Sequence, residues 1–463
     1  MKRVFAPSYL KLLSDNNVFA VGCQLKILKG KKMKRILILV VSILAIFQLG
    51  CGAGAVVFEW FLGDMPRDTA DDRCEIDLLE REAATKEAID LLDKIGGKYV
   101  RASGGNLARI EIDGKEITDE TIDIIKKQIV LEELIIKNVQ DFGDDKLLKF
   151  KSMGQLTKLS LVNVAITDKS VELLVDNLPN NMFQFLRKLD LSRNNSLTDE
   201  SISHISKFQV LEELVLVGCS FTEAKLSELL VLKNLRALDI RGNLSIGNKG
   251  LEVLSGLESL RSFKHSSPAV DDAGVSAMIA AKNLETFDIQ DFSMSSDAGK
   301  SFNKMPKLTS LIIYRCTNFG SAGLDALRGK QLKRLTLRDL PAVDDSGLAA
   351  FRELSSLKRL YLQEMDSISD EGARNLIYLK ELETLEIRNM PVLTDKTAEY
   401  IARLTNLKSI SIIGTQLTDK TIDAIMKLPK LQEVTLKGNN LITPDATNNL
   451  RNSKKFQKLQ IID

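Results

Sequence analysis

The stretch Leu156-Thr-Lys-Leu159-Ser-Leu161 recurs, with small changes, along most of the 463-residue chain. Successive copies start 24 or 25 residues apart, except for one step of 30 residues between Leu156 and Leu186. A fixed period of this length predicts a solenoid in which each copy is one structural unit. The 14 copies start at Leu107, Leu131, Leu156, Leu186, Leu211, Leu235, Leu260, Leu284, Leu308, Leu332, Leu357, Leu382, Leu407 and Leu431.

Each copy reads as a short strand, a turn and a short helix. Alternation predicts that Leu159 and Leu161 point into the core, whereas Ser160 and Val162 point out. The helix start is marked by Thr-Asp or Ser-Asp, because a hydroxyl suits the cap position and an acid suits the helix dipole. One such unit cannot bury its own apolar face, so stacked neighbours must share a core. The pairs are Thr118-Asp119, Thr167-Asp168, Thr198-Asp199, Ser369-Asp370, Thr394-Asp395 and Thr418-Asp419.

These copies resemble the leucine-rich-repeat family, in its variety with helices on the convex side, from residue 107 to residue 463. The resemblance implies an α/β solenoid with a parallel sheet on its concave side, and it implies binding of a protein rather than catalysis. The family usually has Asn or Cys nine residues into each copy. Here that turn column is degenerate, so we expect apolar packing to hold many turns. It reads Lys115, Val139, Val164, Asn194, Cys219, Asn243, Pro268, Phe292, Cys316, Leu340, Met365, Met390, Thr415 and Asn439.

Charge is distributed unevenly along the chain. Residues 1–35 hold nine Lys or Arg and one acid. Subtracting these from the totals of 64 basic and 62 acidic residues leaves a net charge of −6 for the rest. A mildly acidic body argues against nucleic acid as the main partner.

An uncharged run, residues 36–58, follows the basic cluster and is long enough to cross a bilayer as a helix. We therefore expect residues 1–35 in the cytoplasm, a transmembrane anchor or signal at 36–62, and the repeats on the exoplasmic side of the cell membrane. A lipoprotein signal is an alternative, because Leu49-Gly50-Cys51 resembles the end of a lipobox and Cys51 would carry the lipid. A simple cleaved signal is the third reading. Met33 then becomes a candidate start, with residues 1–32 as an extension.

Residues 63–106 read as an acidic stalk followed by a small cap for the first copy. The apolar spacing predicts a helix over 75–95, ended by Gly96-Gly97, and then a strand over 98–101. This entry segment resembles that of bacterial cell-envelope leucine-rich-repeat proteins. Terminal repeats need such a cap because their core is otherwise open.

Two other places depart from the regular repeat. The step of 30 residues holds an insertion near residues 177–183, which we interpret as a neutral loop. The chain ends on a half repeat, whose open strand edge Lys454, Lys455 and Lys458 could protect from pairing. A dimer formed through this edge is the alternative to the monomer that we expect.

Residues able to perform chemistry are few, and we expect neither catalysis nor a cofactor. The two histidines, His204 and His265, have no acid or cysteine at a metal-ligand spacing, so no metal site is predicted. Cys219 and Cys316 occupy turn positions and are expected to be buried thiols. No nucleophile elbow or phosphate-binding loop occurs in the sequence.

The outward strand positions, the third, fifth and seventh of each copy, remain as the candidate binding surface. In the copies from Leu308 to Leu382 they bring together two tyrosines and four arginines, which are types that dominate binding hot spots. We predict a concave, non-enzymatic binding surface for a protein or an acidic glycan. The rival interpretation is a structural spacer or a self-assembling envelope component. The predicted residues are Tyr314, Arg334, Arg338, Arg359, Tyr361 and Arg388.

Overall fold

The computed structural model describes residues 69–463, except 129, 151–155, 177–181, 454 and 463. The chain forms two compact units, residues 1–87 and 88–463, and all the repeats lie in the second. The basic N-terminus (1–35), the predicted membrane segment (36–62), Cys51 and most of the insertion lie outside the described residues. Within the described part of the chain, no helix has the length and apolar character needed to span a membrane.

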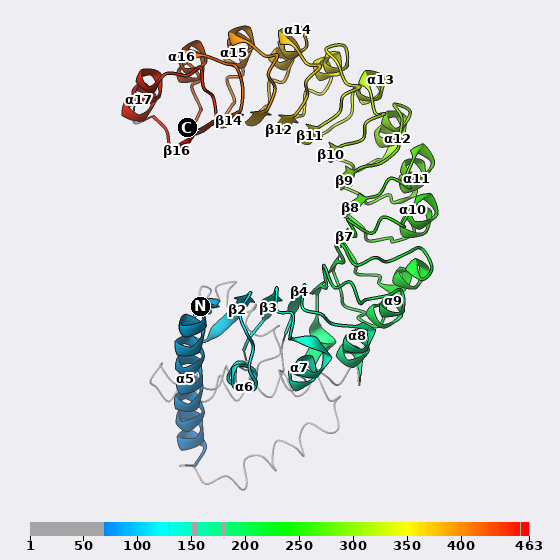
Figure 1. Cartoon of the computed structure of the whole chain (residues 1–463), viewed down its shortest axis with the longest axis vertical. Coiled ribbons are helices and arrows are strands. Elements are labelled where there is room, and N and C mark those ends of the chain that lie inside the picture. The colour runs from blue at the N-terminus through cyan, green and yellow to red at the C-terminus, as the bar shows by residue number, and fades with distance from the viewer. Residues whose placement is uncertain (1–68, 129, 151–155, 177–181, 454, 463) are drawn as a thin grey trace, which may run out of the picture. The chain divides into compact units, whose positions relative to one another are not determined.

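The described residues form one 16-stranded sheet whose strands follow each other in chain order (Figure 1). β1 is antiparallel to β2, and β2 to β16 are parallel, so the predicted parallel sheet is confirmed. The strands are β1 (Lys98–Arg101), β2 (Leu107–Asp113), β3 (Glu133–Lys137), β4 (Lys158–Val162), β5 (Lys188–Asp190), β6 (Glu213–Val215), β7 (Ala237–Asp239), β8 (Ser262–Ser266), β9 (Thr286–Gln290), β10 (Ser310–Tyr314), β11 (Arg334–Arg338), β12 (Arg359–Gln363), β13 (Thr384–Arg388), β14 (Ser409–Ile413), β15 (Glu433–Lys437) and β16 (Lys458–Ile462).

Short helices connect these strands on the convex side of the second unit, and the strands line its concave side (Figure 1). The α-helices are α5 (Thr69–Ile95), α6 (Asp119–Lys126), α7 (Gly143–Lys149), α8 (Asp168–Val175), α9 (Glu200–Ile205), α10 (Asn248–Leu254), α11 (Asp272–Ala277), α12 (Ala298–Lys304), α13 (Ser321–Asp325), α14 (Asp370–Ala373), α15 (Asp395–Ile401), α16 (Asp419–Met426) and α17 (Pro444–Asn452). The 3-10 helices are η2 (Met182–Phe185), η3 (Leu226–Val231), η4 (Met278–Ala280), η5 (Gly347–Arg352) and η6 (Arg374–Tyr378).

The repeated leucines form one continuous core between sheet and helices. Leu159 and Leu161 are fully buried, as the alternation predicted. Equivalent leucines of successive copies are direct register partners, as Leu335 is of Leu360 and Leu360 is of Leu385. Each such burial contributes roughly 1.5–3 kcal/mol relative to exposure, and the stack repeats it along the sheet.

The turn column is held in two ways. The Asn194 amide donates to the carbonyls of Leu161 (2.7 Å) and Leu191 (2.8 Å) and accepts from the N–H of Val164 (2.9 Å). Asn243, two copies further along, makes the same set of bonds. Apolar residues in this column, such as Phe292, are buried instead. The prediction of apolar packing is confirmed, because many turns have no side-chain donor for their carbonyls.

In the copy that carries Pro268, a different side chain contacts the carbonyls of the turn. Pro268 is exposed, and the buried ring of His265 lies against the carbonyls of Ile240 (3.4 Å) and Ile246 (2.9 Å) instead. Burial lowers the pKa of His265, and hydrogen bonds to these carbonyls only partly oppose the effect. His265 therefore has a structural role in this turn.

The Thr-Asp pairs link neighbouring copies as well as capping single helices. Asp370 lies at the start of α14, but its carboxylate accepts from the N–H (3.0 Å) and hydroxyl (2.5 Å) of Thr394, which caps α15 in the next copy. Thr397 also donates to it (2.5 Å). The acids therefore bridge copies, which the cap interpretation did not include. The pairs in which the carboxylate accepts from both the N–H and the hydroxyl of the next copy are Asp144–Thr167, Asp168–Thr198, Asp199–Thr222, Asp272–Ser295, Asp345–Ser369, Asp370–Thr394, Asp395–Thr418 and Asp419–Thr443.

Glycine in the first helical turn lets the middle copies pack closely. A Cβ at Gly299 would lie 2.2 Å from the carbonyl oxygen of Gly323 in the next helix, which no side chain can tolerate. At the same position in other copies, the hydroxyls of Ser170, Ser201 and Thr397 donate to the acid that bridges the copies. The glycine column is Gly250, Gly274, Gly299, Gly323, Gly347 and Gly372.

An aromatic run crosses the core of the same copies. Phe302 on α12 is fully buried, with its ring centroid 6.0 Å from that of Phe287 and 6.2 Å from that of Phe319. Phe263 extends the run, 5.8 Å from Phe287. Aromatic rings at such separations gain energy beyond the area that they bury.

The N-terminal helix is longer than predicted, while its end and the following strand agree with the prediction. α5 begins at residue 69 rather than at residue 75, so residues 69–74, which were read as part of the acidic stalk, are helical. Gly96 adopts φ 71°, and the N–H of Gly97 donates to Leu92 (2.7 Å). Ala88 and Leu92 are buried in the core of the second unit.

At the C-terminal end, β16 pairs with β15 and completes the half repeat. Lys455 does not guard the strand edge. Its ammonium donates to the carbonyls of Met426 and Leu428, both at 2.7 Å, and thereby caps the end of α16. The proposed edge protection by Lys455 was therefore wrong, because the chain bends this side chain back into the previous copy.

Candidate functional site

The six predicted residues lie on four adjacent strands of the concave face, β10 to β13. Tyr314, Arg338, Gln363 and Arg388 are successive register partners across one row. Arg334 and Arg359 are partners in a second row, and Tyr361 lies in the row between the two. We call Tyr314, Arg334, Arg338, Arg359, Tyr361 and Arg388 the arginine–tyrosine patch; its role in binding remains a prediction.

Two arginines of the patch are engaged by acids that the sequence analysis did not single out. The Arg338 guanidinium donates twice to Glu364, at 3.2 Å each, and Arg388 donates to Glu386 at 2.9 Å. Glu364 directly follows a strand, in the copy after that of Arg338. An acid at this offset is a pattern that could have predicted the pair.

Tyr314 is held between two guanidinium groups. Arg338 lies over its ring at 4.3 Å and Arg315, another residue not predicted, at 4.2 Å from the centroid. Arg315 also forms a double ion pair with Asp291, at 2.7 and 2.9 Å. This hydrogen bonding raises the pKa of Arg315 above its ordinary value. The ring of Tyr314 is thus fixed in place by charged neighbours.

The other two arginines of the patch have no carboxylate partner among the described residues. Arg334 stacks over the ring of Tyr361 at 4.8 Å, and its Nε is buried without a hydrogen-bond partner. The hydroxyl of Thr336, on the same strand, is likewise buried and unpartnered. Arg359 is exposed beside them.

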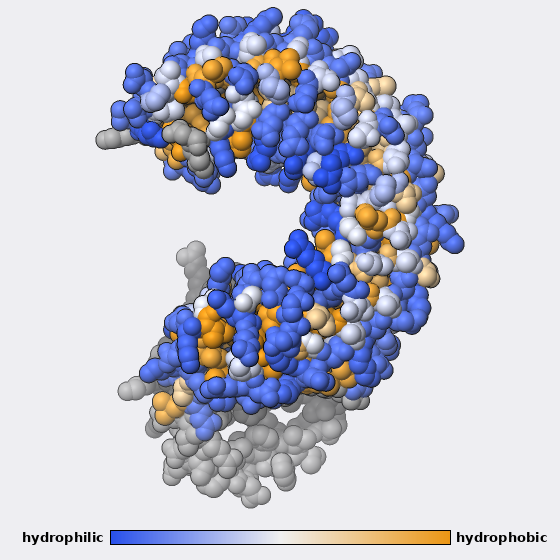
Figure 2. Space-filling model, viewed as in Figure 1, coloured by the Kyte–Doolittle hydropathy of each residue, from blue (hydrophilic) through white to orange (hydrophobic). Residues whose placement is uncertain are grey.

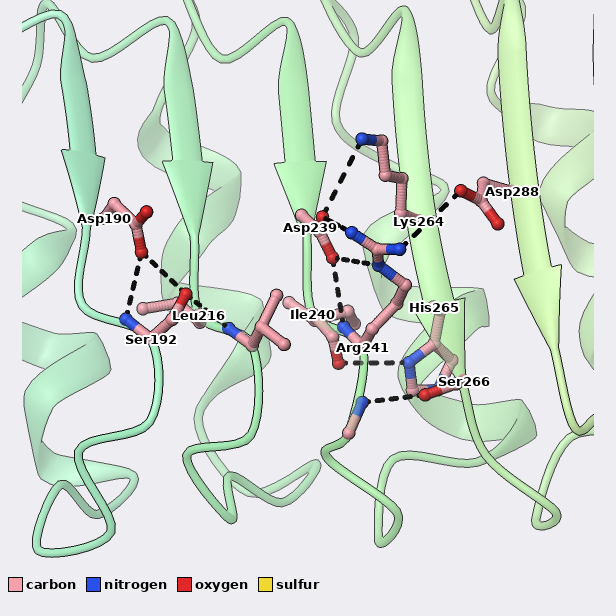
Figure 3. A network of polar contacts seen from close by, with 12 residues as sticks. Asp190, Ser192, Leu216, Asp239, Ile240, Arg241, Lys264, His265, Ser266 and Asp288 are labelled. Atoms are coloured by element: carbon pink, nitrogen blue, oxygen red, sulfur yellow. Dashed lines mark hydrogen bonds and ion pairs between the residues drawn. The ribbon is translucent and has the colours of Figure 1, made fainter. Parts of the chain in front are cut away.

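A second group of charges, which was not predicted, lies on and just after the three strands that precede β10, namely β7, β8 and β9 (Figure 3). Arg241 holds Asp239 with both arms of its guanidinium, at 2.9 and 2.6 Å. Lys264 approaches Asp239 at 3.9 Å, and Arg241 approaches Asp288 at the same distance. We call Asp239, Arg241, Lys264 and Asp288 the central charge cluster. The sequence feature that could have predicted this cluster is the acid at the fifth position of several copies, as at Asp239 and Asp288.

Asp288 is the poorly solvated member of this cluster. It is 7% exposed, and its Oδ1 has no hydrogen-bond partner. Burial raises the pKa of Asp288, and the attraction of Arg241 offsets this only in part. Asp288 occupies the fifth position of its copy, in the row between the two rows of arginines. Although this position was expected to point outward, some of its side chains are buried, and Ser160 at the same position is 6% exposed.

Replacing Asp288 with Asn is expected to raise the free energy of unfolding at neutral pH by about 1 kcal/mol, because a buried charge without adequate partners is removed. A raised folded-state pKa means that the ionised carboxyl destabilises the fold above that pKa. The difference between variant and wild type should therefore shrink as pH falls towards 3.8, the ordinary value. Thermal unfolding across pH 3–8 measures it.

Asp190→Asn is the matched control, because Asp190 occupies the same strand position but accepts from the N–H (3.0 Å) and hydroxyl (2.6 Å) of Ser192. It should gain no stability. A gain for Asp288→Asn that is equally large at acidic pH would show that ionisation of Asp288 carries no cost.

Cys219 and Cys316 are buried free thiols, as expected. Cys219 donates to the carbonyl of Leu191 at 3.2 Å, and Cys316 donates to the carbonyl of Tyr314 at 3.5 Å; both side chains are buried. Burial raises the pKa of Cys219 to about 11 and that of Cys316 to about 12. Neither thiol is available as a thiolate at neutral pH.

Hydrophilic side chains predominate along the concave margin of the second unit (Figure 2). The model of the Leucine Rich repeat family matches residues 184–206 and 231–255. No curated protein matches the chain. An internalin from Listeria monocytogenes is structurally similar, with 20% identity, 75% of this chain and 93% of that chain covered, and a TM-score of 0.45. The yeast Rad7 and Elc1 complex gives 17% identity, 84% and 95% coverage, and a TM-score of 0.49.

Proposed function

Because the chain is a leucine-rich-repeat protein, we propose that it is a non-enzymatic module that binds a protein partner through the concave face of its sheet. Leucine-rich-repeat proteins generally mediate protein binding. The observation that carries the proposal is the arginine–tyrosine patch, which gathers two tyrosines and four arginines on strands β10 to β13. Aromatic and arginine side chains dominate the energetics of protein interfaces.

The patch is also organised before any partner arrives. Tyr314 is clamped by Arg315 and Arg338, and the guanidinium of Arg334 rests on Tyr361. Long side chains that are already ordered lose less conformational entropy on binding. This favours a protein partner, although an acidic glycan is the alternative ligand.

The proposal places this module on the exoplasmic side of the cell membrane. Its support is the sequence alone, namely the basic residues 1–35 followed by an uncharged run at 36–58. Lipidation at Cys51 is the alternative means of attachment.

A structural or self-assembling role is the rival function, and the terminal strands favour it. Among the described residues β1 pairs only with β2 and β16 only with β15, so each leaves one strand edge without a partner there. Such an edge can pair with another chain.

The concave proposal predicts that Tyr314→Ala lowers capture of a protein partner by the full-length chain at least tenfold, since an interface tyrosine at a hot spot contributes that much. Tyr378→Ala is the matched control, because Tyr378 is 42% exposed on the convex element η6. Quantitative capture from native envelopes, with both variants in parallel, measures the effect. Equal capture by the two variants, with a molecular mass in light scattering that rises with concentration, would instead support self-assembly.

A further inference from the structure

We propose that Arg334, Thr336 and Arg359 form a subsite for the carboxylate of a single acidic side chain on the protein partner. The inference rests on the proposed function and specifies the chemistry that the concave face recognises. It begins from polar atoms that lack partners inside the protein.

Six buried side-chain nitrogen or oxygen atoms in the described residues have no hydrogen-bond partner, and three lie on strands β9 to β11. Two of these three, Nε of Arg334 and the hydroxyl of Thr336, lie two residues apart on one face of one strand. Buried polar groups nearly always have partners, so this pair requires an explanation. Arginine can only donate, and threonine can donate as well as accept. The missing partner must therefore be an acceptor.

The charge at this place also lacks a counterpart. Arg334 and Arg359 are direct register partners on β11 and β12. Like charges directly opposite each other destabilise a sheet. In the same row on β5 and β6, by contrast, Lys188 and Glu213 are oppositely charged partners 2.8 Å apart. The two arginines therefore present two positive charges that nothing in the described chain neutralises.

The nearest acids are already committed to other partners. Glu386 accepts from Gln363 (2.7 Å) and from Arg388 (2.9 Å). Glu364 is held by Arg338, and Glu383 by two lysines. The residues that flank the two arginines in their own row, Ser310 and Thr384, are neutral.

The side chains are shaped for a planar anion. The Arg334 guanidinium lies over the Tyr361 ring, 4.8 Å from its centroid, and its Nε has no hydrogen-bond partner among the described residues. A guanidinium edge matches the two oxygens of a carboxylate. Thr336 lies beside Tyr361 in the register and can donate its hydroxyl to the same anion.

Two acids limit the ligand to one small anion. The middle row of the face reads Asp288, Ile312, Thr336, Tyr361 and Glu386, strand by strand. The two carboxylates are four strands apart, which is about 19 Å at the usual strand spacing. A polyanion that reached across the row would meet one or both of them. The arrangement thus favours one acidic side chain with neutral neighbours over a charged glycan or nucleic acid.

The test probes an array of short peptides that differ only in a central Glu, Gln or phosphoserine, with the full-length chain kept in mild detergent. The wild-type protein should favour Glu over Gln by about tenfold, as expected for a charged hydrogen-bonded pair. Arg334→Gln with Arg359→Gln should remove this preference, and Thr336→Val should reduce it. The matched control, Lys396→Gln with Arg403→Gln, makes the same charge change at exposed positions outside the sheet and should keep the preference.

Three results would overturn the proposal. One is the absence of a Glu preference in the wild type, and another is its retention in the double arginine variant. A stronger response to phosphoserine would assign the subsite to phosphate.

The double variant should unfold at or above the wild-type temperature, because it removes a like-charge pair; lower stability would mark a structural role. Loss of partner capture in Tyr314→Ala without any Glu preference would leave the concave function standing and remove this subsite alone.

Discussion

Phe302→Ala is expected to lower the free energy of unfolding by about 3–5 kcal/mol, the cost of truncating a fully buried aromatic side chain. The ring lies near Phe287 on the strand of its own copy and near Phe319 in the following copy. Its removal leaves a cavity between two copies, which cannot close because Gly299 and Gly323 already bring the adjacent helix backbones together. Denaturant unfolding of the full-length chain measures the loss.

Phe185→Ala is the control for this prediction, because Phe185 is 45% exposed on η2. It should change stability by roughly 0.5 kcal/mol or less. A steeper or shallower denaturant dependence for Phe302→Ala alone would show that the copies on its two sides unfold separately. An effect of Phe302→Ala no larger than that of the control would contradict the description of one continuous core.

Asp370→Ala is expected to lower the free energy of unfolding by about 2–3 kcal/mol, since three donors lose a charged acceptor at once. The carboxylate accepts from the N–H and hydroxyl of Thr394 and from the hydroxyl of Thr397, which is fully buried. Asp366→Ala is the matched control, because Asp366 lies in the same copy and is exposed. It should be nearly neutral in a thermal unfolding comparison.

The effect should also depend on pH. Burial by itself raises the pKa of Asp370, but the hydrogen bonds from Thr394 and Thr397 hold it below its ordinary value of 3.8. A carboxyl with a lowered folded-state pKa stabilises the fold above 3.8 and loses this contribution as pH falls through the lowered pKa. Asp370→Ala and wild type should therefore converge in strong acid. A constant difference down to pH 2 would show that the bridge between copies is not electrostatic.

The elements predicted well are those that depend on the sequence pattern within one copy. The strands, the inward leucines and the end of the N-terminal helix at Gly96 follow from spacing and local propensity. The early start of α5 was missed, because an acidic segment without a strong apolar face is equally typical of a linker. The bridging role of Asp370 was missed for another reason, because its partners belong to a different copy and spacing does not show which group it reaches.

The candidate site was predicted in position and only partly in chemistry. The period placed the four arginines side by side, because a strand spacing repeats as regularly as the leucines do. It did not show that Arg338 and Arg388 are neutralised by Glu364 and Glu386. Those pairings depend on side-chain direction and on residues beyond the strand positions that point outward.

The sequence by itself determined that this chain is a stack of strand–helix units with a concave sheet of known outward residues. A solenoid has contacts only between adjacent units, so a one-dimensional period is sufficient to specify it. Only the tertiary structure decided which charges pair and which remain free. Asp288 and Thr336 in the middle row, and Arg334 on the same strand as Thr336, each keep a buried polar atom without a hydrogen-bond partner among the described residues.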